Sequence, residues 1–222
     1  APSPIPSSIM REMPRELSVA EIQDLVERFA RAACRAREAE LDAVELHGSH
    51  GYLLAQFLSP FANQRTDEYG GSLANRARFC LEVIGRVKEQ AGEDFPVIFR
   101  LNGEERVPGG LTLAEAKAIA PLLEAAGADA IHVSVGPFES RTAVVAAPMG
   151  VKPGFIVPLA REVKSSVRVP VITVNRITDA RLAEKILREV AADLVAMGRA
   201  LLADPELPNK AARGAYDEVC PC

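Results

Sequence analysis

Five short apolar runs, each followed by a segment of helical periodicity, constrain the fold of this 222-residue chain more than any other feature. Strands that alternate with single helices indicate crossover units and a parallel sheet. We expect strands over 43–47, 96–101, 130–135, 169–174 and 193–197. We expect helices over about 19–39, from Ser72 onward, over about 112–126, up to about 164, over about 179–190 and after Gly198.

The number of units limits the architecture. A (β/α)8 barrel needs eight strands and typically about 250 residues, so a barrel built from these runs lacks three units. The alternative is a doubly wound open sheet, but the glycine-rich phosphate fingerprint after its first strand is absent. Residues 1–17 are proline-rich and should form a loop, and Ser18 with Glu21 predicts a capping box for the first helix. We therefore expect an α/β fold that is a partial TIM barrel, with open edges near 43–47 and 193–197.

The composition favours a protein that acts on small molecules rather than on nucleic acids or membranes. The net charge of −4 and pI near 5.6, with scattered Lys and Arg, argue against a nucleic-acid partner. No window approaches the roughly 18 apolar residues of a membrane span, so we expect no membrane partner. The four cysteines do not form the pattern of a secreted disulfide framework, and no signal peptide is recognisable. We therefore expect a cytoplasmic protein.

The segment 45–79, which begins inside the first apolar run, concentrates chemically active residues. Its motifs are His47-Gly-Ser-His50-Gly-Tyr52-Leu-Leu, Gln56-Phe-Leu-Ser-Pro60, Arg65-Thr-Asp-Glu-Tyr-Gly-Gly-Ser72 and Asn75-Arg76-Ala-Arg78-Phe79. This combination resembles the old yellow enzyme family of flavin-dependent ene-reductases, especially the branch with bacterial 2,4-dienoyl-CoA reductases and NADH:flavin oxidoreductases. That family places a proline-rich loop after its third barrel strand. The resemblance therefore implies that the chain corresponds to strands four to eight.

His47 and His50 are the candidate catalytic pair. The loops after the strands form the active face of a parallel barrel, and His47 lies at a strand end. Two neutral imidazoles that donate to one carbonyl oxygen would polarise an α,β-unsaturated carbonyl for hydride addition. The resemblance implies that they form this clamp, and that Tyr52 protonates the α-carbon after flavin N5 delivers hydride to the β-carbon. The alternative, zinc ligands or hydrogen-bonded loop histidines, has neither a third ligand nor an HExxH motif in its favour.

Arg100 is the first candidate cofactor ligand. It shares a strand face with Ile98 by period two and should point into the barrel mouth. An inward guanidinium needs an anionic partner, and a reduced flavin carries negative charge at pyrimidine N1 and O2. The resemblance implies this role for Arg100. A salt bridge to Glu45 is the alternative, and both interactions can coexist.

Two further positions are candidates for the FMN phosphate. Barrels often bind phosphate at the loops after strands seven and eight. Asn175 and Arg176 follow the fourth apolar run, and Gly198 and Arg199 follow the fifth. The resemblance assigns all four to FMN, with NAD(P)H as the hydride donor.

The remaining features have secondary expectations. His132 should be an interior packing residue paired with Glu45 or Ser134. The loops 108–110 and 136–154 should cover the mouth of the barrel and shape substrate choice. Multidomain relatives hold a [4Fe–4S] cluster at about the place of residues 215–222, and by resemblance Cys222 is its candidate first ligand.

The sequence thus predicts an FMN-dependent NAD(P)H oxidoreductase with a partial-barrel domain at 18–214. Its substrate would be a small-molecule alkene, namely an enone, enoate or dienoyl thioester. One alternative is a non-catalytic fragment that lacks half the flavin site, since the family's first three strands supply the rest. Another is a different phosphate-binding barrel without flavin. The open edges predict a homo-oligomer or a segment that supplies the missing strands.

Overall fold

The sheet is a single parallel array in which chain order and spatial order coincide. The computed structural model describes residues 1–7, 11–137, 139–140 and 147–222. Its strands are β1 (Val44–Gly48), β2 (Val97–Asn102), β3 (Ala130–Ser134), β4 (Val171–Thr173) and β5 (Leu194–Val195), in the order β1-β2-β3-β4-β5. A doubly wound sheet reverses its strand order at a switch point. The uninterrupted order therefore excludes that alternative and is the order of consecutive barrel units.

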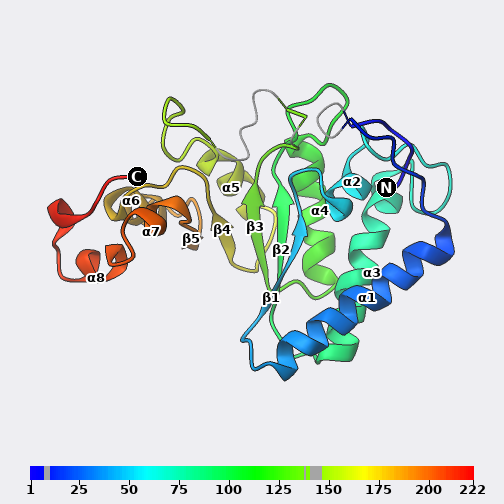
Figure 1. Ribbon diagram of the computed structural model, residues 1–222, viewed down its shortest axis with the longest axis horizontal. Helices are drawn as coiled ribbons and strands as arrows, with labels where there is room; N and C mark the ends of the chain where they lie inside the picture. Colours follow the sequence, from blue (N-terminus) through cyan, green and yellow to red (C-terminus); the bar gives the residue numbers. More distant parts are fainter. Residues whose placement is uncertain (8–10, 138, 141–146) are drawn as a thin grey trace.

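The helices follow the strands around one side of this array. They are α1 (Val19–Glu38), α2 (Leu53–Leu58), α3 (Leu73–Ala91), α4 (Leu113–Ala125), α5 (Val157–Lys164), α6 (Ala180–Arg188), α7 (Arg199–Ala203) and α8 (Leu207–Ala212), with a 3-10 turn, η1, at Tyr216–Glu218. α1 packs on α3, α3 on α4 and α4 on α5. Figure 1 shows α1, α3 and α4 together beside β1 to β3, and α6 to α8 near the C-terminus. The predicted capping box of α1 is confirmed, because Ser18 and Glu21 cap each other's backbone N–H groups.

β1, β2 and β3 each present an apolar face to the helices and a more polar face to the other side. Leu46, Phe99, Ile131 and Val171 lie in register, and all are buried in the main hydrophobic core. Buried aliphatic side chains of α3 and α4 pack against them, among them Ile84 of α3. The opposite face carries the next row in register, which is His47, Arg100, His132 and Ile172. Because the apolar face anchors the sheet to its helices, the polar row is held toward the inside of the arc.

Some elements differ from the sequence prediction. β5 is only two residues long where 193–197 was predicted, and α2, α8 and η1 were not predicted. Residue 138 and residues 141–146 of the predicted mouth loop 136–154 lie outside the described residues. Over the described ranges, no helix is both long and apolar enough to cross a bilayer.

Candidate active site

The end of β1 places His47 on the polar face of the sheet. The strand closes at Gly48, where an added Cβ would lie 2.3 Å from the ring of Phe99 on β2. Only glycine fits this close approach to β2. The loop that carries His50 begins directly after this glycine. The position of that loop is thus fixed by the packing of β1 on β2.

His50 sits in a strained backbone conformation that its neighbours hold in place. Its φ is +63°, in the left-handed region that few residues other than glycine adopt. Its backbone N–H donates to Oδ1 of Asn102 at 3.4 Å, and its Nε2 shares a 2.6 Å hydrogen bond with Oγ of Ser134. Ser134 and Asn102 end β3 and β2 in register, so two strand ends support one loop residue.

His47, His50 and Tyr52 converge into one cluster. The ring centroids of His47 and His50 are 4.9 Å apart, with the rings at 70° to each other. The centroid of Tyr52 lies 5.1 Å from that of His47, and Tyr52 is half exposed at the start of α2. The three side chains that the sequence grouped by spacing are therefore neighbours in space.

Burial keeps both histidines neutral near pH 7. Burial, followed by the positive charge of Arg100, lowers the pKa of His50 to about 3. The same two causes lower the pKa of His47, partly opposed by Glu45. A neutral imidazole has one N–H donor and one acceptor nitrogen. The pair can therefore donate hydrogen bonds to a neutral carbonyl oxygen.

Arg100 lies beside these histidines on β2 and has incomplete pairing. Its Nη1 is 3.8 Å from Oε1 of Glu45, while Nδ1 of His132 donates to Oε2 of the same carboxylate at 2.7 Å. Both predicted partners of Glu45 are confirmed. Burial raises the pKa of Glu45, but the hydrogen bond from His132 and nearby positive charges more than offset it, so the pKa lies below its ordinary value. Among the described residues, Nε of Arg100 is buried without a partner.

The remaining predicted ligands gather around one cavity of about 440 Å³ beyond β4 and β5. It is lined by Arg100, Asn175, Arg176, Gly198, Arg199 and Cys222, together with Met149 and neighbouring apolar residues. The two loop arginines also clamp one stretch of backbone. Nη1 of Arg176 donates to the carbonyl of Pro148 at 2.8 Å, and Nη1 of Arg199 donates to that of Ala147 at 2.9 Å.

Backbone strain marks this cavity as well. Asn175 and Arg176 have φ values of +79° and +52°, so two successive residues adopt the left-handed conformation. Such strain persists only where the surroundings enforce it, and it is frequent at ligand sites. Cys222 and Cys220 are exposed free thiols, and within the described ranges no three His, Cys, Asp or Glu side chains are placed to share a metal ion.

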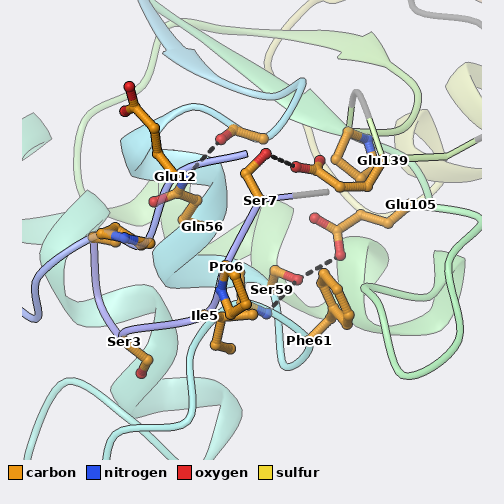
Figure 2. A pocket seen from close by; sticks show the side chains of 15 residues that line it. Ser3, Ile5, Pro6, Ser7, Glu12, Gln56, Ser59, Phe61, Glu105 and Glu139 are labelled. Carbon is orange, nitrogen blue, oxygen red and sulfur yellow. Dashed lines mark hydrogen bonds between the residues drawn. The ribbon is translucent and has the colours of Figure 1, made fainter. Parts of the chain in front are cut away.

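A second, smaller cavity of about 220 Å³ lies between the N-terminal segment and the loop that follows β1 (Figure 2). Oγ of Ser7 donates to Glu139 at 3.0 Å, and Oγ of Ser59 donates to the deeply buried Glu105 at 2.6 Å. The amide of Gln56 donates to the carbonyl of Gly51 at 2.9 Å. No local sequence pattern predicts this cavity, because its walls come from segments far apart in the chain.

Two site residues were not predicted as partners of His50. Ser134 and Asn102 each lie two positions after a residue already placed on the polar face, His132 and Arg100 respectively. Period-two spacing was therefore a usable signal for both. The spacing does not predict the register between β2 and β3, and this register brings the two strand ends to the same histidine.

Comparison with family models decides the relationship. Residues 2–218 match the model of the NADH:flavin oxidoreductase / NADH oxidase family. The chain belongs to this family. Among curated members, the NADH oxidase of Thermoanaerobacter brockii is 49% identical over 222 residues, covering 100% of this chain and 34% of that protein. The NADPH dehydrogenase of Bacillus pumilus is 42% identical over 212 residues, covering 96% of this chain and 60% of that protein. The chain thus spans about a third to three fifths of these relatives.

Similarity to solved structures confirms the fold. A 2-naphthoyl-CoA reductase in complex with 2-naphthoyl-CoA superposes with a TM-score of 0.94 at 35% identity, covering 100% of this chain and 34% of that one. Morphinone reductase in complex with tetrahydroNAD gives 0.74 at 34% identity, covering 92% and 52%. The predicted partial TIM barrel of the old yellow enzyme type is therefore confirmed, and the family is one of oxidoreductases.

Proposed function

We propose that this chain provides the substrate-activating site and much of the FMN site of an NAD(P)H-dependent ene-reductase. One observation carries the proposal: His47, which belongs to the cluster with His50 and Tyr52, is the register partner of Arg100, and Arg100 lines the cavity that also holds Arg176 and Arg199. An acceptor-polarising group and an anion-binding cavity thus meet along one rim of the sheet.

The residues around the larger cavity fit FMN. Among the described residues, Nε of Arg100 and Nε of Arg176 are buried without partners, so the cavity offers unused donors for an anionic ligand. An added Cβ at Gly198 would meet nothing within 4 Å, so a ligand has room to approach this backbone. Arg100 would face the pyrimidine end, and Asn175, Arg176, Gly198 and Arg199 would hold the phosphate. FMN, when bound, supplies the hydride.

The protein side chains provide polarisation and a proton. His47 and His50 donate hydrogen bonds to the carbonyl oxygen of an enone, enoate or dienoyl thioester, and their neutrality lets them do so without competing counterions. Tyr52 gives its phenolic proton to the α-carbon. The names of two relatives support an unsaturated acyl substrate: a cinnamate reductase of Clostridium sporogenes, 40% identical over 238 aligned residues, and the 2-naphthoyl-CoA reductase above.

Further parts of the proposal concern the wider protein. Residues 18–214 form the flavin-binding domain, and NAD(P)H reduces the flavin. Cys222 contributes to a [4Fe–4S] cluster together with thiolates outside this chain. The open sheet edges are covered by a second subunit or by further barrel strands, and the protein works in the cytoplasm.

Rapid kinetics of the purified holoprotein test the proposal. The visible flavin spectrum should be present, and NAD(P)H should bleach it. The double variant His47→Ala, His50→Ala should keep this reductive step while reoxidation by an enone slows by at least about 100-fold, the usual cost of losing an oxyanion donor. Reoxidation at the parent rate would refute the clamp. A colourless protein that binds a sugar phosphate would instead favour the flavin-free barrel.

A further inference from the structure

The hydrogen bond between His50 and Ser134 determines which nitrogen of the ring can face a ligand. Nε2 of His50 lies 2.6 Å from Oγ of Ser134, and both residues are almost fully buried, at 6% and 1% exposure. This bond occupies Nε2. Nδ1 is then the one ring nitrogen of His50 that is left to interact with a bound molecule.

The chemistry of a neutral imidazole makes this arrangement selective. A neutral ring carries its proton on only one nitrogen. Among the described residues, His50 is the one hydrogen-bond partner of the Ser134 hydroxyl, which is buried, so its hydrogen has an acceptor only if it is donated to Nε2. The proton of the neutral ring then resides on Nδ1, and His50 presents an N–H donor. If Nε2 donated to Ser134 instead, Nδ1 would present a lone pair and would repel a carbonyl oxygen.

We propose that Ser134 is a positioning residue that fixes the Nδ1–H tautomer of His50 and so turns it into a hydrogen-bond donor for the substrate oxygen. The tautomer is a property of this chain alone, whereas its catalytic effect rests on the proposed function. Asn102 assists from the other side, because its Oδ1 accepts the backbone N–H of His50 and holds the left-handed turn. The register of β2 and β3 thus determines where the Ser134 hydroxyl lies, and this hydroxyl sets the orientation and tautomer of His50.

The loop contains a matched control. Ser49 precedes His50 and is also fully buried, but within the described residues its hydroxyl has no hydrogen-bond partner. Ser49→Ala and Ser134→Ala therefore remove the same atom from similar surroundings, and only the second removes the bond to His50. Ser134→Thr keeps the hydroxyl and serves as the rescue variant.

Nitrogen NMR of histidine-labelled protein measures the tautomer directly, with His50 assigned by its loss in His50→Asn. We expect Nδ1–H in the parent, in Ser49→Ala and in Ser134→Thr. Ser134→Ala should move His50 substantially toward Nε2–H, the usual form of free histidine. Reoxidation of the holoprotein by an enone should slow by about tenfold or more in Ser134→Ala, with the NAD(P)H step unchanged.

Each outcome separates the possibilities. An Nε2–H tautomer in the parent, or an unchanged tautomer in Ser134→Ala, would overturn the proposal. A shifted tautomer with unchanged reoxidation would overturn its catalytic part. If the tautomer responds as expected in a protein that binds no flavin, tautomer selection stands and the proposed function fails. Folding of Ser134→Ala is verified by the remaining NMR spectrum, so a collapsed variant cannot imitate any of these results.

Discussion

At the scale of single residues, the site depends on polar groups that are buried and kept in one charge state. His50 is the clearest case, because its pKa of about 3 lies well below the ordinary value of 6.5. The unfolded chain takes up a proton below pH 6.5, while the folded protein does so only near pH 3. Stability contributed by neutral His50 is therefore present above pH 6.5 and is lost as the pH falls.

His50→Asn should remove this acid sensitivity. Asparagine tolerates a positive φ, and its backbone N–H can still donate to Oδ1 of Asn102, so the loop should persist. Between pH 6.5 and 5 we expect the parent to lose about 2 kcal/mol more unfolding free energy than the variant. Urea unfolding at both pH values measures the difference. Parallel losses in the two proteins would show that His50 is not held neutral.

Glu105 behaves in the opposite sense. Burial raises its pKa, although Oγ of Ser59 and the backbone N–H of Leu111 both donate to its Oε2. A carboxyl group with a raised folded pKa stabilises the protein below its ordinary value of 4.5. That contribution disappears as the pH rises through the raised value.

Glu105→Gln should therefore be tolerated and should help at neutral pH. The amide oxygen can accept both hydrogen bonds, and no charge is buried. We expect the variant to be at least as stable as the parent at pH 7, and to lose this relative advantage at pH 4. Thermal unfolding at both pH values provides the comparison, and a variant that is less stable at pH 7 but equal at pH 4 would contradict the assignment.

At the scale of elements, the end of α6 carries avoidable strain. Val190 has a φ of +54°, a conformation that is costly for a β-branched residue. The backbone N–H groups of Ala191 and Val190 bond the carbonyls of Ile186 and Leu187, which is the Schellman pattern that normally ends in glycine. Val190 is also 64% exposed, so its side chain contributes little packing.

Val190→Gly should stabilise the protein by about 1 kcal/mol, because glycine adopts the left-handed region without a steric penalty. Leu187→Gly, one turn earlier inside α6, is the matched control and should cost about 1 kcal/mol. Thermal denaturation ranks the three proteins. Destabilisation by both glycines would mean that the helix end is not strained.

The elements were predictable where a repeated pattern extended over many residues. The long helices and the strand rows follow from periodicity, and the capping box of α1 from Ser18 and Glu21. α2 has six residues and begins at Tyr52 without a side-chain cap, so no local signal announces it. β5 is shorter than predicted because, among the described strands, it forms backbone hydrogen bonds with β4 alone. The hydrogen bond between His50 and Ser134 joins residues 84 positions apart, and only tertiary register reveals it.

At the scale of the whole molecule, the arc has two unsatisfied edges. β1 and β5 each pair on one side within the described chain, and Leu194 of β5 is 50% exposed. The nearby Leu202 of α7 is 83% exposed. Unpaired parallel edges with apolar side chains promote association with other strands.

Leu194→Lys should therefore reduce self-association of the 222-residue polypeptide, because a charged edge disfavours strand pairing. Sedimentation velocity over a range of concentrations measures the shift toward monomer. Met13→Lys introduces the same charge at a site that is 66% exposed but remote from the edge, and it should change nothing. Equal effects of the two lysines would point to net charge rather than to β5.

The agreement between chain order and strand order has a consequence for how this molecule is made. Each of β2 to β5 pairs with the strand synthesised just before it, so this part of the sheet can grow stepwise as the polypeptide leaves the ribosome. Within the described sheet these pairings are all between neighbouring units, and such short-range pairing favours fast formation of the sheet. The order in which the strands are synthesised is thus the order in which they lie in the sheet, and each completed strand offers a free edge to the next one.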